Sequence, residues 1–126
     1  MSAAATKQLL LAEDDAHIAK LVEFILTKRG YEVTAVADGT QAIARLDEKS
    51  WDLILLDVMM PGADGWTVLR SVRASDGLKN VPVLMLTAKG SHKDIATAAE
   101  LGVDDYLTKP FDPDVLFEKV KKLLGE

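Results

Sequence analysis

The chain has 126 residues, of which 48% are hydrophobic and 28% charged, as expected for one globular domain with its own core. It has no cysteine, which excludes disulfides, thiolate catalysis and zinc–thiolate sites. Its net charge of −5 gives no sign of a nucleic-acid-binding surface. No apolar run approaches the roughly 18 residues of a membrane-spanning helix, and the first residues lack a signal-peptide core.

Apolar runs of strand length alternate with segments of helical periodicity along the chain. The predicted strands are residues 8–12, 31–36, 52–56, 81–87 and 103–108. The predicted helices are residues 16–29, 41–49, 65–74, 91–101 and 112–124. This alternation predicts an α/β fold, a doubly wound five-stranded parallel sheet with helices on both faces. We expect residues 1–6 to be a disordered lead-in and residues 7–125 to form one domain.

Chemically capable side chains stand at the carboxyl ends of four predicted strands. Glu13 and Asp14 follow the first strand, and Asp57, Thr87 and Lys109 stand at the ends of the third, fourth and fifth. Open parallel sheets bind ligands outside the carboxyl ends of their strands. We therefore expect these five residues to share one site.

The clustered acids predict a site for a divalent cation. Mg²⁺ is satisfied by a few carboxylate oxygens, keeps several waters and leaves room for a substrate phosphate. Asp14 and Asp57 are candidate ligands, and the backbone carbonyl of Met59 is placed to add another.

Asp57 is the candidate nucleophile, because a carboxylate can accept a phosphoryl group as an aspartyl phosphate. Such chemistry depends on positioning and charge stabilisation. The Lys109 ammonium and the Thr87 hydroxyl could each cover a phosphoryl oxygen, and Ala88 leaves room beside them. Each feature alone is more often structural, and Asp15 is expected simply to cap the first helix. Their occurrence together at four strand ends favours the functional interpretation.

Four segments carry a resemblance to a known family: LLLAEDDAHI, DLILLDVMMPGADGW, VLMLTA and DDYLTKPF. Residues 7–124 resemble the receiver (CheY-like) domain of two-component response regulators. The resemblance implies a flavodoxin-like (βα)5 fold with strand order 2-1-3-4-5. It also implies a cytoplasmic phosphoprotein of a phosphorelay, which accepts a phosphoryl group on Asp57 in the presence of Mg²⁺, or Mn²⁺ as a substitute. The donor would be a phosphohistidine of a histidine kinase or phosphotransfer protein.

The resemblance also assigns roles to the metal and phosphate ligands. Asp14 matches the direct metal ligand, and Glu13 matches an acid that acts mainly through water. Met59 matches the position whose carbonyl binds the metal. Lys109 matches the phosphate-binding lysine, and its bond to Pro110 is expected to be cis.

Two further matches concern switching. Thr87 corresponds to the switch hydroxyl and Tyr106 to the switch aromatic, and together they would change the surface of the fourth helix and fifth strand. Ala63 stands where many relatives carry a larger apolar residue. The side chains of Met59 and Lys89 vary in the family and leave the phosphoryl lifetime undetermined.

Partners follow from the same resemblance. The phosphodonor would dock on the first helix and the loop after Pro110, where Ile18, Ala19 and Val22 could serve docking or the core equally well. A phosphorylation-dependent dimer is one expected state, and neither direct nucleic-acid binding nor membrane association is expected. The downstream output is unknown, and the sequence fits both a stand-alone regulator and a receiver taken from a longer chain.

Three alternatives compete with this interpretation. An aspartyl-phosphate phosphatase of the haloacid-dehalogenase type needs a second acid two residues after the nucleophile, where this chain has Met59. A receiver-like module that only binds partners would not need the full set of acids, Thr87 and Lys109. A flavin site would need a Ser/Thr/Gly-rich phosphate loop after the first strand. We therefore expect a phosphoacceptor rather than a turnover enzyme.

Overall fold

The computed structural model describes residues 6–88 and 92–126, in which strands and helices alternate. Lys89 and nearly all of the predicted lead-in lie outside these residues. The strands are β1 (Gln8–Ala12), β2 (Glu32–Val36), β3 (Leu53–Asp57), β4 (Val83–Ala88) and β5 (Asp105–Lys109). The helices are α1 (Ala16–Lys28), α2 (Gly39–Arg45), α3 (Gly65–Ala74), α4 (His92–Leu101) and α5 (Pro113–Leu123). The predicted order of elements is confirmed.

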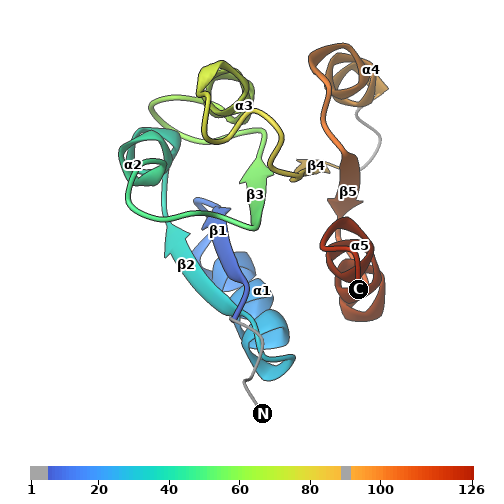
Figure 1. Cartoon of the computed structure of the whole chain (residues 1–126). Helices are drawn as coiled ribbons and strands as arrows, with labels where there is room; N and C mark the ends of the chain where they lie inside the picture. Colours follow the sequence, from blue (N-terminus) through green and yellow to red (C-terminus); the bar gives the residue numbers. More distant parts are fainter. Residues whose placement is uncertain (1–5, 89–91) are drawn as a thin grey trace.

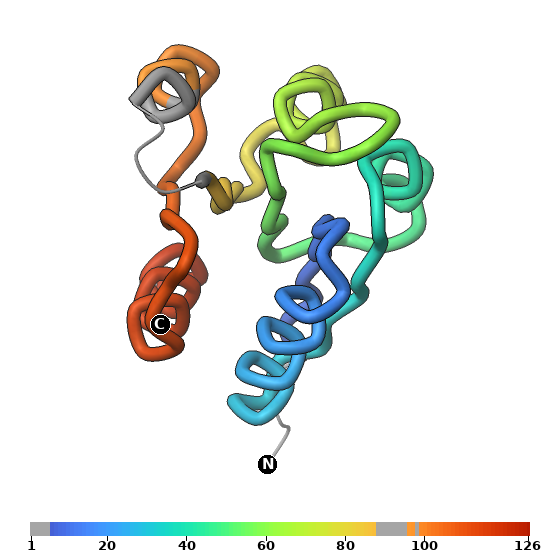
Figure 2. The backbone as a smooth tube through the Cα atoms, turned by 180° about the vertical axis from the view of Figure 1, so that it is seen from behind, coloured from blue at the N-terminus to red at the C-terminus, as the bar shows by residue number. Residues whose placement is uncertain are grey.

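The five strands form one parallel sheet in the order β2-β1-β3-β4-β5, as the resemblance implied. Helices α1 and α5 cover one face, and α2, α3 and α4 cover the other (Figure 1). The view from behind shows the same three layers, with α1 and α5 on the same side of the sheet (Figure 2). This is a flavodoxin-like α/β fold, and β1 and β3 flank the point where the strand order reverses.

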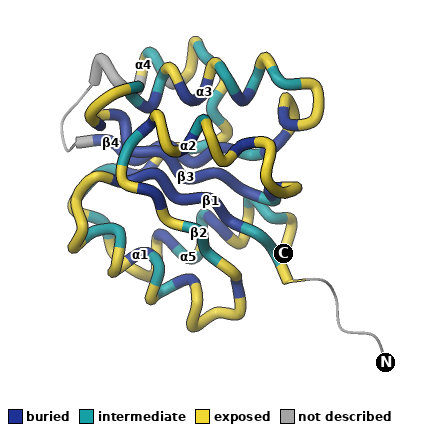
Figure 3. Tube along the Cα trace, turned by 90° about the vertical axis from the view of Figure 1, so that its left-hand side faces the viewer, coloured by how far each residue is buried: buried dark blue, intermediate teal, exposed yellow. Residues whose placement is uncertain are grey.

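The core consists of two apolar layers, one on each face of the sheet, because alternate side chains of a strand point to opposite faces. Leu53 and Leu55 of β3 pack with α1 and α5, whereas Ile54 and Leu56 pack with α2 and α3. All four are fully buried, as are the central residues of β1 and β4 (Figure 3). Each such side chain contributes about 1.5–3 kcal/mol to folding. The core therefore fixes β3, and with it the position of Asp57.

Four helices begin at an aspartate whose side chain accepts hydrogen bonds from the backbone N–H groups of the first turn. The N-caps are Asp15, Asp38, Asp64 and Asp112. Asp15 Oδ1 accepts from the N–H groups of His17 and Ile18 at 2.9 and 3.2 Å, which confirms its predicted capping role. Such caps are each worth about 1 kcal/mol.

Several predicted boundaries were displaced. Helix α2 begins at Gly39 rather than residue 41, because Asp38 caps it. Strand β5 begins at Asp105 rather than residue 103, because the Asp104 carboxylate is used by Arg73 and by the Val83 N–H. Strands β3 and β5 extend one residue beyond their predicted ends, so that they finish on Asp57 and Lys109. Both residues therefore gain the rigidity of the sheet.

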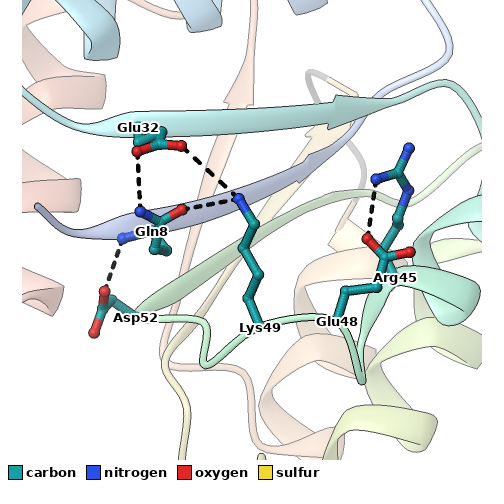
Figure 4. A network of polar contacts seen from close by, with 6 residues as sticks. All are labelled: Gln8, Glu32, Arg45, Glu48, Lys49 and Asp52. Carbon is teal, nitrogen blue, oxygen red and sulfur yellow. Dashed lines mark hydrogen bonds and ion pairs between the residues drawn. The ribbon is translucent and has the colours of Figure 1, made fainter.

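The amino ends of the strands carry a separate polar network, opposite the candidate site (Figure 4). The backbone N–H of Gln8 donates to Asp52 at 2.7 Å, and its side chain joins Glu32 and Lys49. These contacts hold the starts of β1 and β2 to the segment before β3. None of the helices in the described part of the chain combines the length and apolarity that a membrane-crossing helix requires.

Candidate functional site

The carboxyl edge of the sheet brings Glu13, Asp57 and Lys109 together. Glu13 follows β1, Asp57 ends β3 and Lys109 ends β5. All three lie on the α1/α5 side by the alternation of side chains along their strands. The long Lys109 side chain crosses β4, so its Nζ lies 3.2 Å from Asp57 Oδ1 and 2.7 Å from Glu13 Oε1.

The acids form a compact cluster. One carboxylate oxygen each from Glu13, Asp14 and Asp57 lie within 4.8 Å of one another. Glu13 and Asp57 are buried, and Asp14 is exposed at the mouth. Glu13 Oε2 accepts a hydrogen bond from the Asp15 N–H at 3.1 Å, which orients its carboxylate toward the cluster.

The charges of this cluster are not balanced by Lys109 alone. Burial, followed by hydrogen bonding and repulsion from Glu13, raises the pKa of Asp57 to about 7, although Lys109 opposes the shift. Burial lowers the pKa of Lys109, but its pairing with Glu13 and Asp57 outweighs burial and raises that pKa above its usual value. Two buried carboxylates thus compete for one ammonium.

The donor set fits Mg²⁺. Three carboxylates on an open edge offer hard oxygen ligands, and the exposed Asp14 leaves a route for solvent and phosphate. A divalent cation would supply the charge that the single ammonium does not, and the raised Asp57 pKa is the physical sign of that deficit.

Thr87 and Tyr106 lie on the other face of the sheet. Asp57 pairs with Leu86, so the neighbouring Thr87 points to the α3/α4 side. The register pairs Met85 with Tyr106 and Thr87 with Thr108, which makes Tyr106 a diagonal neighbour of Thr87 on that face. The Thr87 hydroxyl is fully buried without a hydrogen-bond partner, and Tyr106 is 38% exposed. The structure therefore places these two residues on adjacent strands, as predicted, but does not bond Thr87 to Asp57.

The loop after Asp57 is held close to β3 by glycine. The Gly65 N–H donates to the Val58 carbonyl at 3.0 Å, and a Cβ at Gly65 would lie 2.4 Å from the Asp57 carbonyl oxygen. A Cβ at Gly39 would likewise lie 1.7 Å from the carbonyl oxygen of Ala63.

Two further residues of the predicted site lie in the loops around it. Met59, in the loop after Asp57, exposes 72% of its surface. The Lys109–Pro110 bond is cis, as expected.

Sequence reasoning missed some supporting residues. Arg73 binds the carbonyls of Lys79, Val81 and Gly102 and the Asp104 carboxylate, joining α3 to the starts of β4 and β5. Trp51, to which no role was assigned, is buried and donates to the Arg45 carbonyl at 3.2 Å. A lone arginine in an amphipathic helix carries no signal for such contacts. The glycine in the segment DGW could have indicated the close approach of Gly65.

Fold and site together define a doubly wound α/β protein with an acidic cluster, able to hold a divalent cation, at its topological switch point. The response regulator receiver domain family matches residues 9–121. The chain is 40% identical over 118 residues to the DNA-binding response regulator MtrA of Mycobacterium tuberculosis, covering 94% of this chain and 50% of MtrA. It is 38% identical over 117 residues to the transcriptional regulatory protein YclJ of Bacillus subtilis, covering 93% of this chain and 50% of YclJ.

Among solved structures, the receiver domain of the sensor histidine kinase PA1611 from Pseudomonas aeruginosa aligns with a TM-score of 0.89 and 34% identity. The alignment covers 97% of this chain and all of that domain, which has a magnesium ion coordinated in its active-site cleft. This chain belongs to the response regulator receiver domain family, and it is a phosphoacceptor rather than a turnover enzyme. It spans about half the length of the curated relatives it matches.

Proposed function

We propose that Asp57 accepts a phosphoryl group from a phosphohistidine and that Lys109 and Thr87 bind the transferred group. The observation that carries this proposal is the position of the buried Asp57 carboxylate at the switch point of the sheet. There Asp57 and Glu13 share a single counter-ion, the Lys109 ammonium, within a cluster of three acids. In the transfer, an oxygen of Asp57 forms a bond to phosphorus while the imidazole N–P bond breaks. Water later attacks phosphorus, releases inorganic phosphate and restores the carboxylate.

Each residue has a distinct task in this scheme. Asp14, Asp57 and the Met59 carbonyl would hold Mg²⁺ directly and Glu13 would act through water; the ion supplies charge neutralisation for the phosphoryl oxygens. Lys109 would exchange part of its contact with Asp57 for a phosphoryl oxygen, because a phosphoryl group offers it a stronger acceptor. The domain would comprise residues 7–125, and its place of action would be the cytoplasm, where kinases use ATP.

Thr87 and Tyr106 would convert the new charge into a change of shape. The buried, unpartnered Thr87 hydroxyl gains a hydrogen-bond acceptor if it turns toward the phosphoryl group. That movement would free space on the α3/α4 face of the sheet, next to Thr87 on the neighbouring strand β5. The partly exposed Tyr106 side chain could turn into that space. The surface of α4 and β5 would then differ between the two states, which is the requirement for a two-state signal.

Membership of the family implies a histidine kinase partner. We propose that a histidine kinase or phosphotransfer protein is the donor. We further propose that the domain itself does not bind nucleic acid and that phosphorylation favours a dimer in solution.

The test is phosphoryl uptake from acetyl phosphate with Mg²⁺, measured by intact-protein mass. We expect a single added phosphoryl group that is absent from Asp57→Ala and after chelation of Mg²⁺, and retained in the control Asp47→Ala, which removes an exposed acid outside the cluster. Uptake by Asp57→Ala at this site, or uptake unaffected by chelation, would contradict the proposal. Absence of uptake by the wild type from both acetyl phosphate and every candidate kinase would indicate a module that only binds partners.

A further inference from the structure

The loop between β3 and α3, residues 58–64, packs against the start of α2 at two points that leave no room for a further side chain. A Cβ at Gly39 would lie 1.7 Å from the Ala63 carbonyl oxygen and 3.0 Å from the Ala63 Cβ. A Cβ at Gly62 would lie 2.7 Å from the Thr40 hydroxyl oxygen. Helices α2 and α3 lie side by side on this face of the sheet (Figure 1). Each contact therefore depends on a glycine, one in α2 and one in the loop.

Packing rather than hydrogen bonding fixes the middle of this loop. The Gly65 N–H donates to the Val58 carbonyl at 3.0 Å, which closes the loop on itself. Among the residues that the structure describes, none forms a backbone–backbone hydrogen bond with residues 59–63. The Met60 side chain is buried in the layer of α2 and α3, whereas that of Met59 is exposed. The position of the Met59 carbonyl therefore depends on what its neighbours in the loop pack against.

The start of α2 is a firm support for this packing. The Asp38 side chain accepts a hydrogen bond from the Gln41 N–H at 2.7 Å, and the Asp38 carbonyl accepts one from the Ala42 N–H at 3.1 Å. Gly39 is buried, and Ala42 is fully buried in the core. Because the cap and the core hold the first turn of α2, the loop must give way wherever the two would overlap.

From these observations we infer that Gly39 is a positioning residue for the Met59 carbonyl and, through it, for the divalent cation. The inference rests on the proposed function, in which that carbonyl is one of the ligands. Mg²⁺ demands nearly octahedral geometry, so displacement of one ligand weakens binding. A side chain at position 39 would push Ala63 away from α2 and shift the loop that carries Met59. Residues that orient metal ligands change the affinity for the metal by about 10- to 100-fold when they are replaced.

A purely structural role for Gly39 predicts a different result. Crowding that only strained the fold would lower the free energy of unfolding and leave the Mg²⁺ affinity of the folded molecules unchanged. A positioning role predicts weaker Mg²⁺ binding under conditions in which the variant is fully folded. The dissociation constant for Mg²⁺ therefore separates the two roles, and its measurement requires no phosphodonor.

The experiment is a calorimetric titration of Mg²⁺ into the metal-free 126-residue chain and into its Gly39→Ala variant. We expect the dissociation constant to be about tenfold higher for Gly39→Ala. Phosphoryl uptake from acetyl phosphate should be slower at low Mg²⁺ and should approach the wild-type rate at saturating Mg²⁺, because Asp57 and Lys109 are unchanged. In NMR spectra of the wild type, the signal of the Met59 carbonyl carbon should shift when Mg²⁺ is added. The variant should need more Mg²⁺ for the same shift.

Two control variants accompany Gly39→Ala, and thermal unfolding checks that each variant is folded. Gly77→Ala adds the same methyl group where nothing lies within 4 Å, and it should bind Mg²⁺ like the wild type. Val120→Ala leaves a cavity at a fully buried residue of α5, and it should lose stability without weaker Mg²⁺ binding.

If Gly39→Ala is not folded, Ala63→Gly takes its place. This variant frees the loop instead of crowding it. It should weaken Mg²⁺ binding about two- to fivefold, because glycine adds backbone freedom that is lost when the ion binds.

A folded Gly39→Ala that binds Mg²⁺ as tightly as the wild type would overturn the inference and leave the proposed function intact. So would an equal loss of affinity in Val120→Ala, or unchanged binding by Ala63→Gly where Gly39→Ala does not fold. A wild type that binds no Mg²⁺ would overturn both the inference and the proposed function.

Discussion

Lys109 forms an ion pair of 2.7 Å with Glu13, a carboxylate whose side chain is fully buried. The same ammonium lies 3.2 Å from Asp57, so one cation serves two acids of the candidate site. Whatever binds Lys109 more strongly, such as a phosphoryl oxygen, must compete with Glu13. The stability of the fold should therefore depend on the charge of each of these three groups.

Removing the cation alone should destabilise the fold. Lys109→Met leaves Glu13 buried without a counter-charge, and breaking a buried pair in this way costs about 3 kcal/mol. The double variant Lys109→Met/Glu13→Gln should recover most of that loss, as measured by urea unfolding without metal. Lys119→Met is the control, because its 3.0 Å pair with Asp105 is more exposed and should cost less than about 1 kcal/mol. An equal loss in the single and double variants would show that the ion pair is not the cause.

The metal-free fold should lose stability as the pH rises from about 4 to about 7. The pKa of Asp57 is raised to about 7, so the folded state keeps a proton that the unfolded chain has already released. The Asp57 contribution is therefore greatest at low pH, and its loss on raising the pH should be on the order of 1–2 kcal/mol after solvent screening. Glu13 and Lys109 both face Asp57 and also affect how stability changes with pH. Comparison of the wild type with Asp57→Asn isolates the part of that change that comes from Asp57.

Unfolding free energies at pH 5 and pH 7.5, with chelator, provide the measurement. The wild type should lose more stability than Asp57→Asn between these values, and Mg²⁺ should reduce the difference. A wild type that follows Asp57→Asn at both pH values would refute this account of the acid cluster.

Thr87→Val should be neutral or stabilising by up to about 1 kcal/mol, although it alters a fully buried residue. The Thr87 hydroxyl has no hydrogen-bond partner, so its removal relieves an unsatisfied group at nearly constant volume. The same variant should still take up a phosphoryl group but show smaller NMR shift changes at Tyr106. A loss above about 1.5 kcal/mol would mean that the hydroxyl is bonded in the folded state.

Gly65→Ala should destabilise the fold by about 1–3 kcal/mol and slow phosphoryl uptake. The new Cβ would meet the Asp57 carbonyl oxygen at 2.4 Å, and overpacking of this kind forces the backbone to move. Gly77→Ala, whose Cβ would meet nothing within 4 Å, should change stability by less than about 0.5 kcal/mol. Equal effects of the two substitutions would rule out the close approach of Gly65 as the cause.

Much of the fold could be predicted because each segment carries its own local signal. The apolar run of β3 is buried on both faces, the Asp15 cap starts α1, and the alternation of strands with helices requires a parallel sheet. The boundaries that were missed, at α2 and β5, depend on side chains that bind distant backbone groups. Asp104 bonds to Val83 and Arg73, and no local pattern reports such contacts.

The sequence by itself determined which acids, hydroxyl and ammonium stand at the carboxyl ends of the strands. This was possible because the apolar periodicity of a strand or a helix can be recognised from consecutive residues. Only the tertiary structure decided that Lys109 reaches Glu13 as well as Asp57, that Thr87 faces the other side of the sheet, and that Arg29 stacks on Phe117. These relations join residues up to 96 positions apart in sequence, as Lys109 and Glu13 are. Strand register and helix packing set them, and both depend on the whole core rather than on any one segment.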